Sequence, residues 1–303
     1  MTHRLWGLVL AGGDGIRVRA LTQVISGSPI PKQYCGIVGR TLLERTLRRT
    51  GRRIPLARTL VVVNRDHLPV ANAQLHDVLP LNLIVQPENR DSGPGMLLPL
   101  AVLERRDPEA TVAVFPSDHW ISSDRRFMRH VERAADAVAR WPERIAVLGI
   151  QPARPDPDCG YLTRGWPLEI DAPSPAFTVG AFFERPDAAL AERLARRGGL
   201  WNSSVMVFRI DTMLAELERL IPERLEVMRR LARRHDERSA AYAAMERWSF
   251  GRDVFARLVQ SLAVVPVTDV GWSDWRTPQA IVRSLAERAE KPLWWASAAA
   301  LVA

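Results

Sequence analysis

An apolar run that breaks into glycines constrains the fold of this chain more than any other stretch. Residues 5–11 are Leu-Trp-Gly-Leu-Val-Leu-Ala, which is long enough for one buried strand. Residues 12–15 are Gly-Gly-Asp-Gly, and Arg17 follows two residues later. Glycine lets the backbone turn sharply and leaves no side chain between backbone and ligand, and the N–H groups of such a turn can surround an anion. The stretch therefore predicts a strand that leads into a phosphate-binding turn.

A tight turn with no ligand is the simplest alternative, and two common phosphate motifs do not match. A P-loop requires Gly, four residues and then Gly-Lys-Ser/Thr, and no lysine stands there. A dinucleotide-binding fingerprint requires a third glycine at the position of Val18. A phosphate-binding turn in this chain would therefore belong to another class.

Strand and helix patterns alternate over the first 150 residues, which predicts an α/β fold with a doubly wound, mostly parallel sheet. The sequence predicts further strands at 58–63, 82–86, 111–115 and 144–150. It predicts helices at 41–53, 66–78, 92–106 and 125–140, and an irregular loop over 18–39. The glycine turn, residues 86–90 and residues 116–119 each follow a strand, so they should meet at one edge of the sheet.

The pattern is less regular after residue 150. Strands are expected at 176–183, from 201 and at 262–267, and helices at 187–197, over most of 211–260 and at 277–290. Residues 292–303 are apolar and include two tryptophans, but they are too few to span a bilayer. We expect this tail to dock on the core or to form a subunit contact.

The formal net charge of +8 raises the question of a nucleic-acid partner. However, the arginines at 48–53 and 229–234 fall on predicted helical faces without interleaved aromatic residues, so solvated helix surfaces explain the charge better. We expect no nucleic-acid partner and no membrane contact. Cys35 and Cys159 are too few for a disulfide framework or a cysteine-rich zinc site, and no signal peptide is evident, so a cytoplasmic location is expected.

Lysine is rare in this chain, and that makes one lysine informative. Lys32 and Lys291 are the only two, and every other one of the 42 Lys and Arg residues is arginine. Lysine supplies a compact point charge where the planar guanidinium of arginine does not fit. Lys32 lies within Pro-Lys-Gln (31–33), so Lys32 and Arg17 are candidate phosphate ligands.

Two aspartates are candidates for a metal site, although singly each could merely cap a turn. Asp118 follows a predicted buried strand, and Asp274 lies in a turn rich in Gly, Trp and Ser. As a pair they could hold one Mg²⁺, which takes one or two carboxylates together with phosphate oxygens of a substrate. Phosphoryl-type transfer needs positioning and positive charge, which Arg17, Lys32 and Mg²⁺ would supply. For His119, a supporting role is favoured over that of general base.

Seven short motifs occur in order between residue 5 and about residue 285. They are Leu-Ala-Gly-Gly-x-Gly-x-Arg (10–17), Pro-Lys-Gln (31–33), Gln-Pro-x-Asn-Arg (86–90), Phe-Pro-Ser-Asp-His (115–119), Phe-x-Glu-Arg-Pro (182–186), Trp-Asn-Ser (201–203) and Gly-Trp-Ser-Asp (271–274). In this set the chain resembles the sugar-1-phosphate nucleotidyltransferases, and most of all the mannose-1-phosphate guanylyltransferases.

This resemblance implies a nucleotide-diphospho-sugar transferase (Rossmann-like) fold and a reaction in which an NTP and a sugar 1-phosphate give an NDP-sugar and pyrophosphate with Mg²⁺. The expected substrates are GTP and mannose 1-phosphate, for polysaccharide biosynthesis. The resemblance assigns catalysis to Arg17, Lys32 and Asp118, and the metal to Asp118 and Asp274. It assigns nucleotide binding to Leu10, Ala11, Gly12, Gly13, Asp14, Gly15, Gln86, Arg90, Gly93 and Asp118. It assigns sugar-phosphate binding to Gly160, Glu184, Arg185 and Asn202.

The resemblance also implies a domain organisation. Residues 1–290 would form a single nucleotidyltransferase domain, with a nucleotide-binding half at about 1–150 and a sugar-phosphate-binding half at about 151–290. The apolar tail, 291–303, would follow. Larger members of the family add a C-terminal cupin isomerase domain, which we do not expect here. A homo-oligomer remains open.

Several positions depart from the family pattern. Ile16 and Arg19 replace a usual Thr and Trp, and Arg276 stands where Gly is common. Gln86 stands where many guanylyltransferases carry Glu, and an amide is less selective than a carboxylate for the N–H donors of guanine. Two alternatives therefore stay open. One is the same chemistry with another sugar 1-phosphate or NTP, and the other is a degenerate relative that binds a sugar nucleotide without making it.

Overall fold

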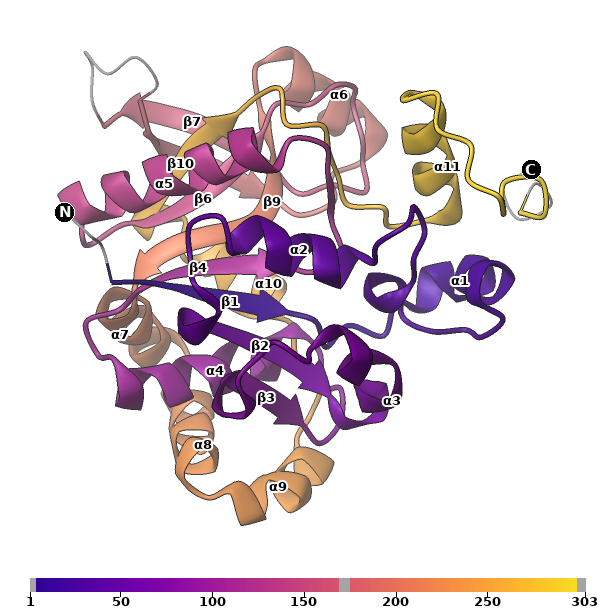
Figure 1. Cartoon of the computed structure of the whole chain (residues 1–303). Coiled ribbons are helices and arrows are strands. Elements are labelled where there is room, and N and C mark those ends of the chain that lie inside the picture. Colours follow the sequence, from indigo (N-terminus) through magenta and orange to yellow (C-terminus); the bar gives the residue numbers. More distant parts are fainter. Residues whose placement is uncertain (1–3, 169–174, 299–303) are drawn as a thin grey trace.

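The computed structural model describes residues 4–168 and 175–298, and its centre is a nine-stranded sheet with helices on both faces (Figure 1). The strands of this sheet are β1 (Leu5–Leu10), β2 (Thr59–Asn64), β3 (Leu83–Gln86), β4 (Thr111–Pro116), β6 (Ile145–Ile150), β7 (Tyr161–Pro167), β8 (Phe177–Phe183), β9 (Leu200–Arg209) and β10 (Leu262–Val267). Two short strands, β5 (Trp120–Ile121) and β11 (Trp272–Ser273), form a separate antiparallel pair. Each strand that the sequence predicts is present, whereas β5, β7 and β11 were not predicted.

The sheet is mixed rather than mostly parallel, which corrects one prediction. Its strand order is β3-β2-β1-β4-β9-β6-β10-β8-β7. The pairs β1–β2, β2–β3, β1–β4 and β6–β10 are parallel, whereas β9 is antiparallel to β4 and β6, and β8 is antiparallel to β7 and β10. The first 150 residues do supply parallel strands. However, β4 and β6 are separated because β9, from much later in the chain, lies between them.

Helices cover both faces of the sheet. They are α1 (Arg19–Ser26), α2 (Leu42–Thr50), α3 (Leu68–Ala71), α4 (Ser92–Arg106), α5 (Asp124–Arg140), α6 (Ala188–Arg196), α7 (Ile210–Leu220), α8 (Pro222–Arg233), α9 (Arg238–Ala244), α10 (Phe250–Asp253) and α11 (Pro278–Ala286). Successive side chains of a strand point to opposite faces. Leu8 accordingly packs in one apolar layer with α4, α7 and α8, and Val9 packs in the other with α5. This two-sided burial explains why β1 is apolar throughout.

Two predictions about local structure are wrong. Residues 18–39 contain α1 as well as loop, because Leu21 is buried in an apolar cluster and Gly27, with a φ of 75°, ends the helix. Of the Gly and Pro residues in this stretch, Gly27 marks the end of the helix, and the others lie in the turns that follow it. The helix predicted over 66–78 is limited to α3, between two 3-10 turns. Pro69 lies in its first turn, where the missing N–H of proline is tolerated.

A third apolar cluster joins α1, α11 and the chain that follows α11. Trp275 and Leu285 are fully buried in it, and Trp294 packs against it. The indole Nε1 of Trp294 donates a hydrogen bond to the carbonyl of Ile37, at 2.8 Å. The described part of the tail therefore docks on the core. Residues 1–3 and 299–303, to which the predicted domain and tail extend, lie outside the described residues.

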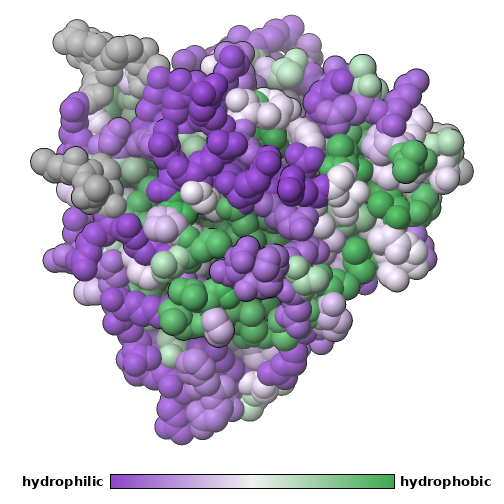
Figure 2. Space-filling model, in the orientation of Figure 1, coloured by the Kyte–Doolittle hydropathy of each residue, from purple (hydrophilic) through white to green (hydrophobic). Residues whose placement is uncertain are grey.

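Local acidic partners offset part of the arginine charge. Arg229 pairs with Glu104 at 2.9 Å and with Glu218 at 2.7 Å. Arg49 departs from the prediction of solvated arginines, because it is 2% exposed and its Nε donates to Asp124 at 2.9 Å. Figure 2 shows hydrophilic surface over α2 and α5 and again over α8 and α9, with hydrophobic surface between them and near α11. None of the helices in residues 4–168 and 175–298 has the length and apolar character needed to cross a membrane.

His130 on α5 should make stability depend on pH. Its side chain is partly buried, and its Nδ1 has no hydrogen-bond partner among the described residues. Burial, aided by Arg133 and Arg129 and opposed by Asp269, lowers the pKa of His130 from 6.5 to about 4. The folded protein therefore keeps a neutral imidazole where the unfolded chain already binds a proton. Stability should be full above pH 6.5 and should fall by about 2 kcal/mol as the pH drops to 4.

Denaturant unfolding at pH 7 and pH 4.5 measures this effect. His130→Leu removes the titrating group and should reduce the difference between the two free energies of unfolding. His76→Leu is the matched control, because the side chain of His76 is 72% exposed and should contribute little. If His130→Leu keeps the full difference, His130 is not its source.

Candidate active site

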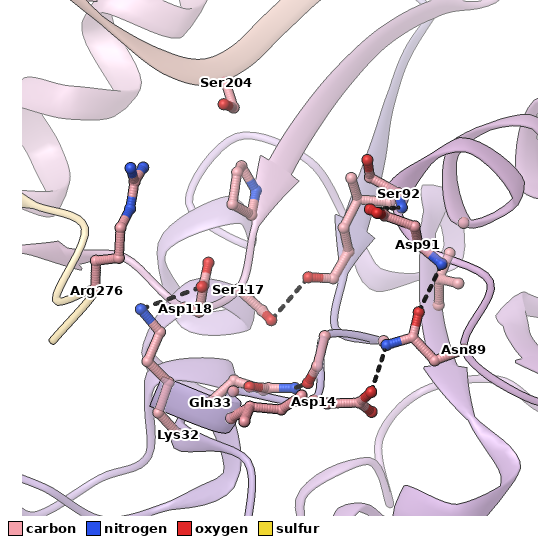
Figure 3. A pocket seen from close by; sticks show the side chains of 18 of the residues that line it. Asp14, Lys32, Gln33, Asn89, Asp91, Ser92, Ser117, Asp118, Ser204 and Arg276 are labelled. Atoms are coloured by element: carbon pink, nitrogen blue, oxygen red, sulfur yellow. Dashed lines mark hydrogen bonds and ion pairs between the residues drawn. The ribbon is translucent and has the colours of Figure 1, made fainter. Parts of the chain in front are cut away.

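A cavity of about 580 Å³ opens at the carboxyl ends of the parallel strands β1 to β4, and Figure 3 shows side chains that line it. The glycine turn, the segment after β3 and the segment after β4 meet there, as predicted from the order of strands. The predicted site residues that line the cavity are Leu10, Gly12, Gly13, Asp14, Gly15, Arg17, Lys32, Gln86, Asp118 and Asp274.

The backbone of the glycine turn is arranged to receive an anion. The carbonyls of Ala11 and Gly13 both accept hydrogen bonds from Nε2 of Gln33, at 2.9 and 2.7 Å. The N–H groups of residues 12–15 donate to none of the residues that the structure describes. Because the carbonyls are held by the protein, these N–H groups are left for a ligand in the cavity. Ala11 itself contributes through its carbonyl and does not line the cavity.

Glycine is required at two positions of the turn. Gly15 has a φ of 59°, a conformation that other residues rarely adopt. A Cβ on Gly12 would lie 2.8 Å from Nε2 of Gln86, which leaves no room for it. Asn64 holds the carbonyl of Gly12 through Nδ2 at 2.5 Å, and its Oδ1 accepts from Nε2 of Gln86 at 3.0 Å. Gln86 is 3% exposed, and its Oε1 accepts from Tyr242, so both ends of the amide are engaged by the protein.

Asp14, within the turn, is held by two side chains. Nδ2 of Asn89 donates to its Oδ2 at 2.7 Å, and Nε2 of His67 lies 3.2 Å from its Oδ1 (Figure 3 shows the bond from Asn89). Burial lowers the pKa of His67 although Asp14 acts to raise it, so the imidazole is neutral near pH 7. The carboxylate of Asp14 therefore has a fixed orientation at the wall of the cavity.

Lys32 is buried at the floor of the cavity, 5% exposed. Its ammonium donates to the carbonyl of Asp274 at 2.5 Å and to the carbonyl of Trp275 at 3.0 Å, and it lies 3.2 Å from Oδ2 of Asp118. An ammonium has three N–H donors, so these three oxygens match it fully. The planar guanidinium of arginine cannot direct its N–H groups to these three oxygens in the same way, which explains why a lysine occurs here in a chain that otherwise uses arginine.

Asp118 is kept ionised and oriented by its neighbours. Partial desolvation acts to raise the pKa of Asp118, but Lys32 and His119 outweigh it and hold the pKa below its usual value. Nδ1 of His119 accepts from the indole of Trp272 at 3.3 Å, and burial lowers the pKa of His119 despite the nearby aspartates. A neutral ring that accepts at Nδ1 carries its proton on Nε2, which lies 3.7 Å from Oδ1 of Asp118. His119 thus lies next to Asp118, and its supporting role stays a prediction.

Asp118 and Asp274 could together hold one divalent cation. The side chain of Asp118 is 40% exposed to the cavity. Oδ2 of Asp274 is buried and accepts no hydrogen bond from a described residue, although Nε of Arg276 lies 2.9 Å away. Within the described ranges, no three His, Cys, Asp or Glu side chains form a metal-binding group, so further ligands would have to be phosphate oxygens or water. That donor set fits Mg²⁺.

Sequence reasoning missed one wall of the cavity, formed by the segment between α9 and α10. Arg247 lines the cavity, and the indole of Trp248 covers Gly93 so closely that a Cβ there would come within 2.3 Å. The N–H of Gly93 donates to the carbonyl of Trp248, and Arg90 donates to the carbonyl of Ala243. Arg90 and Gly93 therefore attach this segment and do not line the cavity. A glycine inside a predicted helix was the only available signal of such a close neighbour.

The residues predicted to bind a sugar phosphate form a second cluster beside the cavity. The N–H of Asn202 donates to the carbonyl of Gly160 at 2.8 Å, and Nε of Arg185 lies 3.6 Å from Oε1 of Glu184. A Cβ on Gly160 would lie 3.2 Å from Oε2 of Glu184. These four residues do not line the cavity, but Ser204 does, and its N–H donates to Oδ1 of Asn202 at 2.9 Å. The cluster thus adjoins the cavity through Ser204.

Backbone strain is concentrated around both clusters. Six described non-glycine residues have positive φ values, and four of them lie at or beside the site: Asp91 (72°), Ser204 (57°), Trp275 (47°) and Arg185 (46°); Asp269 and Ala289 (both 55°) lie elsewhere. Such conformations cost about 1–3 kcal/mol each in residues other than glycine; they persist where the surrounding structure enforces them, and they cluster at functional sites. The strain therefore favours the same region as a functional site.

Comparison with known proteins identifies the family. The family model described as "Nucleotidyl transferase" matches residues 6–290. The chain belongs to the nucleotidyl transferase family. It shares the mixed α/β architecture of structurally similar nucleotidyltransferases, and this confirms the predicted nucleotide-diphospho-sugar transferase fold.

Similar members of this family include curated relatives and a solved structure. The chain is 28% identical to the mannose-1-phosphate guanylyltransferase of Escherichia coli (strain K12), over 89% of this chain and 58% of that protein. It is 28% identical to the xanthan biosynthesis protein XanB of Xanthomonas campestris pv. campestris (strain B100), over 88% of this chain and 56% of that protein. A crystal structure described as mannose-1-phosphate geranyltransferase from Thermus thermophilus has a TM-score of 0.81 and 28% identity, covering 93% of this chain and 79% of that chain. This chain spans somewhat over half the length of these curated relatives.

Proposed function

We propose that this nucleotidyl transferase family member joins an NTP to a sugar 1-phosphate, with GTP and mannose 1-phosphate as the preferred pair. A phosphate oxygen of the sugar 1-phosphate attacks the α-phosphorus of the NTP and forms one P–O bond. The P–O bond from the α-phosphorus to the β-phosphate breaks, and pyrophosphate leaves with the electron pair. The product is an NDP-sugar, which is GDP-mannose for the preferred substrates.

Buried Lys32 is the observation that carries this proposal. A fixed cation at the floor of the cavity offsets the negative charge that gathers on the triphosphate as pyrophosphate departs. Arg17 lines the same cavity and has no ion-pair partner among the described residues, so it can bind further phosphate oxygens. The N–H groups of residues 12–15 would complete the phosphate site.

The remaining roles follow from position. We assign the nucleoside to the wall formed by Gln86 and the segment after it, and the sugar phosphate to the cluster of Gly160, Glu184, Arg185 and Asn202. In this assignment Arg90 and Gly93 act indirectly, because they attach the segment that carries Arg247.

A divalent cation, Mg²⁺ in this proposal, would be held by Asp118 and Asp274. When bound, it would neutralise phosphate charge and align the reacting groups. The ring of His119, with Nε2 3.7 Å from Oδ1 of Asp118, forms the neighbouring wall of the metal site. The sugar phosphate needs no general base, because its oxygen is already ionised at neutral pH.

Pyrophosphate release by the purified chain tests the proposal. The four common NTPs would each be combined with mannose 1-phosphate, glucose 1-phosphate and other sugar 1-phosphates in the presence of Mg²⁺. We expect the largest release with GTP and mannose 1-phosphate. Release with another pair would keep the reaction and correct the substrates, and no release with any pair would reject the enzymatic proposal.

A protein that binds a sugar nucleotide without making it is the second candidate. The contact between Arg276 and Asp274 favours it, because it engages one of the two candidate metal ligands. Ile16 also lines the cavity, 69% exposed, where a hydroxyl is usual. Arg19, by contrast, supports the turn, since its Nε donates to the carbonyl of Asp14 at 3.2 Å. Nucleotide binding with no release of pyrophosphate would select this candidate.

Arg247→Ala is expected to weaken NTP binding about tenfold, because a hydrogen-bonded charge contributes roughly 1.5 kcal/mol. Arg247 has no ion-pair partner among the described residues, so its guanidinium is free to meet a ligand. Titration calorimetry with GTP and ATP measures the effect. A loss confined to GTP would place Arg247 at the base, and an equal loss would place it at the phosphates.

Arg252→Ala is the matched control for Arg247→Ala. Arg252 lies on α10, five residues further along, and pairs with Asp253 outside the cavity lining. Its removal should leave both affinities unchanged. Equal weakening in the two variants would show that net charge, rather than contact, explains the result.

We also propose that residues 1–290 act as one nucleotidyltransferase domain, since one sheet includes strands from both halves. The two cysteines are free and buried, which suits the reducing cytoplasm where NTPs are available. Homo-oligomer formation stays a prediction to be tested by measuring mass in solution.

A further inference from the structure

Arg276 occupies a rigid position at the edge of the cavity. It follows Trp275, whose ring is stacked on Trp120 with centroids 4.7 Å apart and whose Nε1 donates to Ser284 at 3.0 Å. Lys32 holds the carbonyls of Asp274 and Trp275 from the other side. The turn is thus anchored on both sides, and the side chains of residues 274 and 276 have little freedom to separate by backbone movement.

The carboxylate of Asp274 is engaged by Arg276 twice. Nε of Arg276 lies 2.9 Å from Oδ2, and the backbone N–H of Arg276 donates to Oδ1 at 3.3 Å. The Nε contact is an ion pair without hydrogen-bond geometry, because Oδ2 has no hydrogen-bond partner among the described residues. The guanidinium of Arg276 therefore balances the charge on Oδ2 of Asp274, but this oxygen accepts no hydrogen bond from a described residue and keeps a lone pair for a ligand.

Arg276 has a second anchor on the sugar-phosphate side. Its Nη1 donates to the carbonyl of Asp158, in the loop that precedes Gly160. The N–H of Asp158 in turn donates to Oδ1 of Asp156 at 3.1 Å, which fixes that loop. The guanidinium of Arg276 therefore joins the loop beside Gly160 to Asp274, a candidate metal ligand. In Figure 3 the side chain of Arg276 extends from the cavity edge beside Lys32 and Asp118.

We propose that Arg276 is an internal counterion that closes Asp274 to divalent cations until an NTP is bound. This inference rests on the proposed function. A guanidinium in contact with Oδ2 of Asp274 repels a second cation and leaves only Asp118, whose Oδ2 already pairs with Lys32, so the free protein should bind a divalent ion weakly. A triphosphate in the cavity offers Arg276 a stronger anionic partner, and Asp274 then becomes available. Nucleotide and cation would thereby increase each other's affinity, as linkage requires.

Binding of Mn²⁺ alone, followed by electron paramagnetic resonance, tests this without turnover. Arg276→Gln removes the charge and should tighten Mn²⁺ binding to the nucleotide-free protein by about tenfold, within the usual range for coupled sites. The double variant with Asp274→Asn should lose that gain, because Asp274 would be the ligand set free. An affinity within twofold of wild type in Arg276→Gln, or a gain that survives Asp274→Asn, would overturn the proposal.

Arg154→Gln is the matched control. Arg154 is a second arginine near the buried Cys159, but it pairs with Asp156 and Glu287 and makes no ion pair with Asp274. It should not tighten Mn²⁺ binding, and an equal gain would assign the effect to general charge and reject the proposal. Thermal unfolding of each variant confirms that it is folded, and Arg276→Met provides a second neutral replacement. If wild type releases no pyrophosphate but Arg276→Gln gains Mn²⁺ affinity, the inference stands and the enzymatic proposal fails.

Discussion

Asp118→Asn is expected to lower pyrophosphate-releasing turnover about 10³-fold while the protein stays folded. The amide is neutral, so it is a poorer ligand for Mg²⁺ and no longer balances the charge of Lys32. Buried Lys32 loses its counter-charge, but it keeps two carbonyl partners and the amide oxygen of Asn can still accept from it, so we expect a stability cost of about 1–3 kcal/mol rather than unfolding. Turnover at saturating substrates, together with thermal unfolding, measures both effects.

Asp77→Asn serves as the control for that variant. Asp77 has a side chain that is 75% exposed and, among the described residues, pairs with His76 alone, so its neutralisation should change neither turnover nor stability. Near-normal turnover in Asp118→Asn would remove Asp118 from the mechanism. Loss of turnover with loss of fold would instead assign Asp118 a structural role.

Lys32→Met should reduce both turnover and stability. The variant loses a cation from the phosphate site, which we expect to lower turnover about 10³-fold. It also leaves the carbonyls of Asp274 and Trp275 without their donor, and a cost of about 3 kcal/mol in the free energy of unfolding is expected. Denaturant unfolding and the pyrophosphate assay measure the two losses separately.

The chain offers a matched control for Lys32 in its only other lysine. Lys291 is exposed beyond α11, so Lys291→Met removes the same charge without touching the cavity and should behave as wild type. Lys32→Arg keeps the charge but brings a planar fork to a position with three convergent oxygens, and it should recover less than a tenth of the turnover. Full activity in Lys32→Arg would show that charge alone is required.

The strands that were predicted begin within one residue of the observed ones, because apolar runs such as β4 and β6 are buried on both faces and bounded by polar turns. The strand β7 was missed because most of its residues are exposed and lack such a run. The position of β9 between β4 and β6 was not predictable, because the residues of a strand do not indicate which earlier strands it will pair with. The helix α1 was missed for a different reason. Gly27 looks like loop sequence, although in the fold it ends a helix.

For the candidate site, the glycine turn, Lys32 and Asp118 were predictable because each follows a strand or departs from the composition of the chain. The supporting contacts were not. His67 and Asn89 hold Asp14, and Trp248 covers Gly93, only because distant segments are folded together. No spacing in the sequence indicates that Arg247 reaches the same cavity, since its segment reads as an arginine-rich helical region.

A chain that leaves the ribosome from its N-terminus cannot assemble this sheet in order. The strand β6 ends at Ile150, but its two neighbours begin only at Leu200 and Leu262. All six residues of β6 are buried in the folded protein. During synthesis this apolar strand therefore has both edges unpaired until β9 and β10 have been made. Unpaired strand edges favour aggregation, and pairing over long stretches of chain is slow. The insertion of β9 that unites the two halves therefore makes the yield of folded protein sensitive to translation rate and to chaperones.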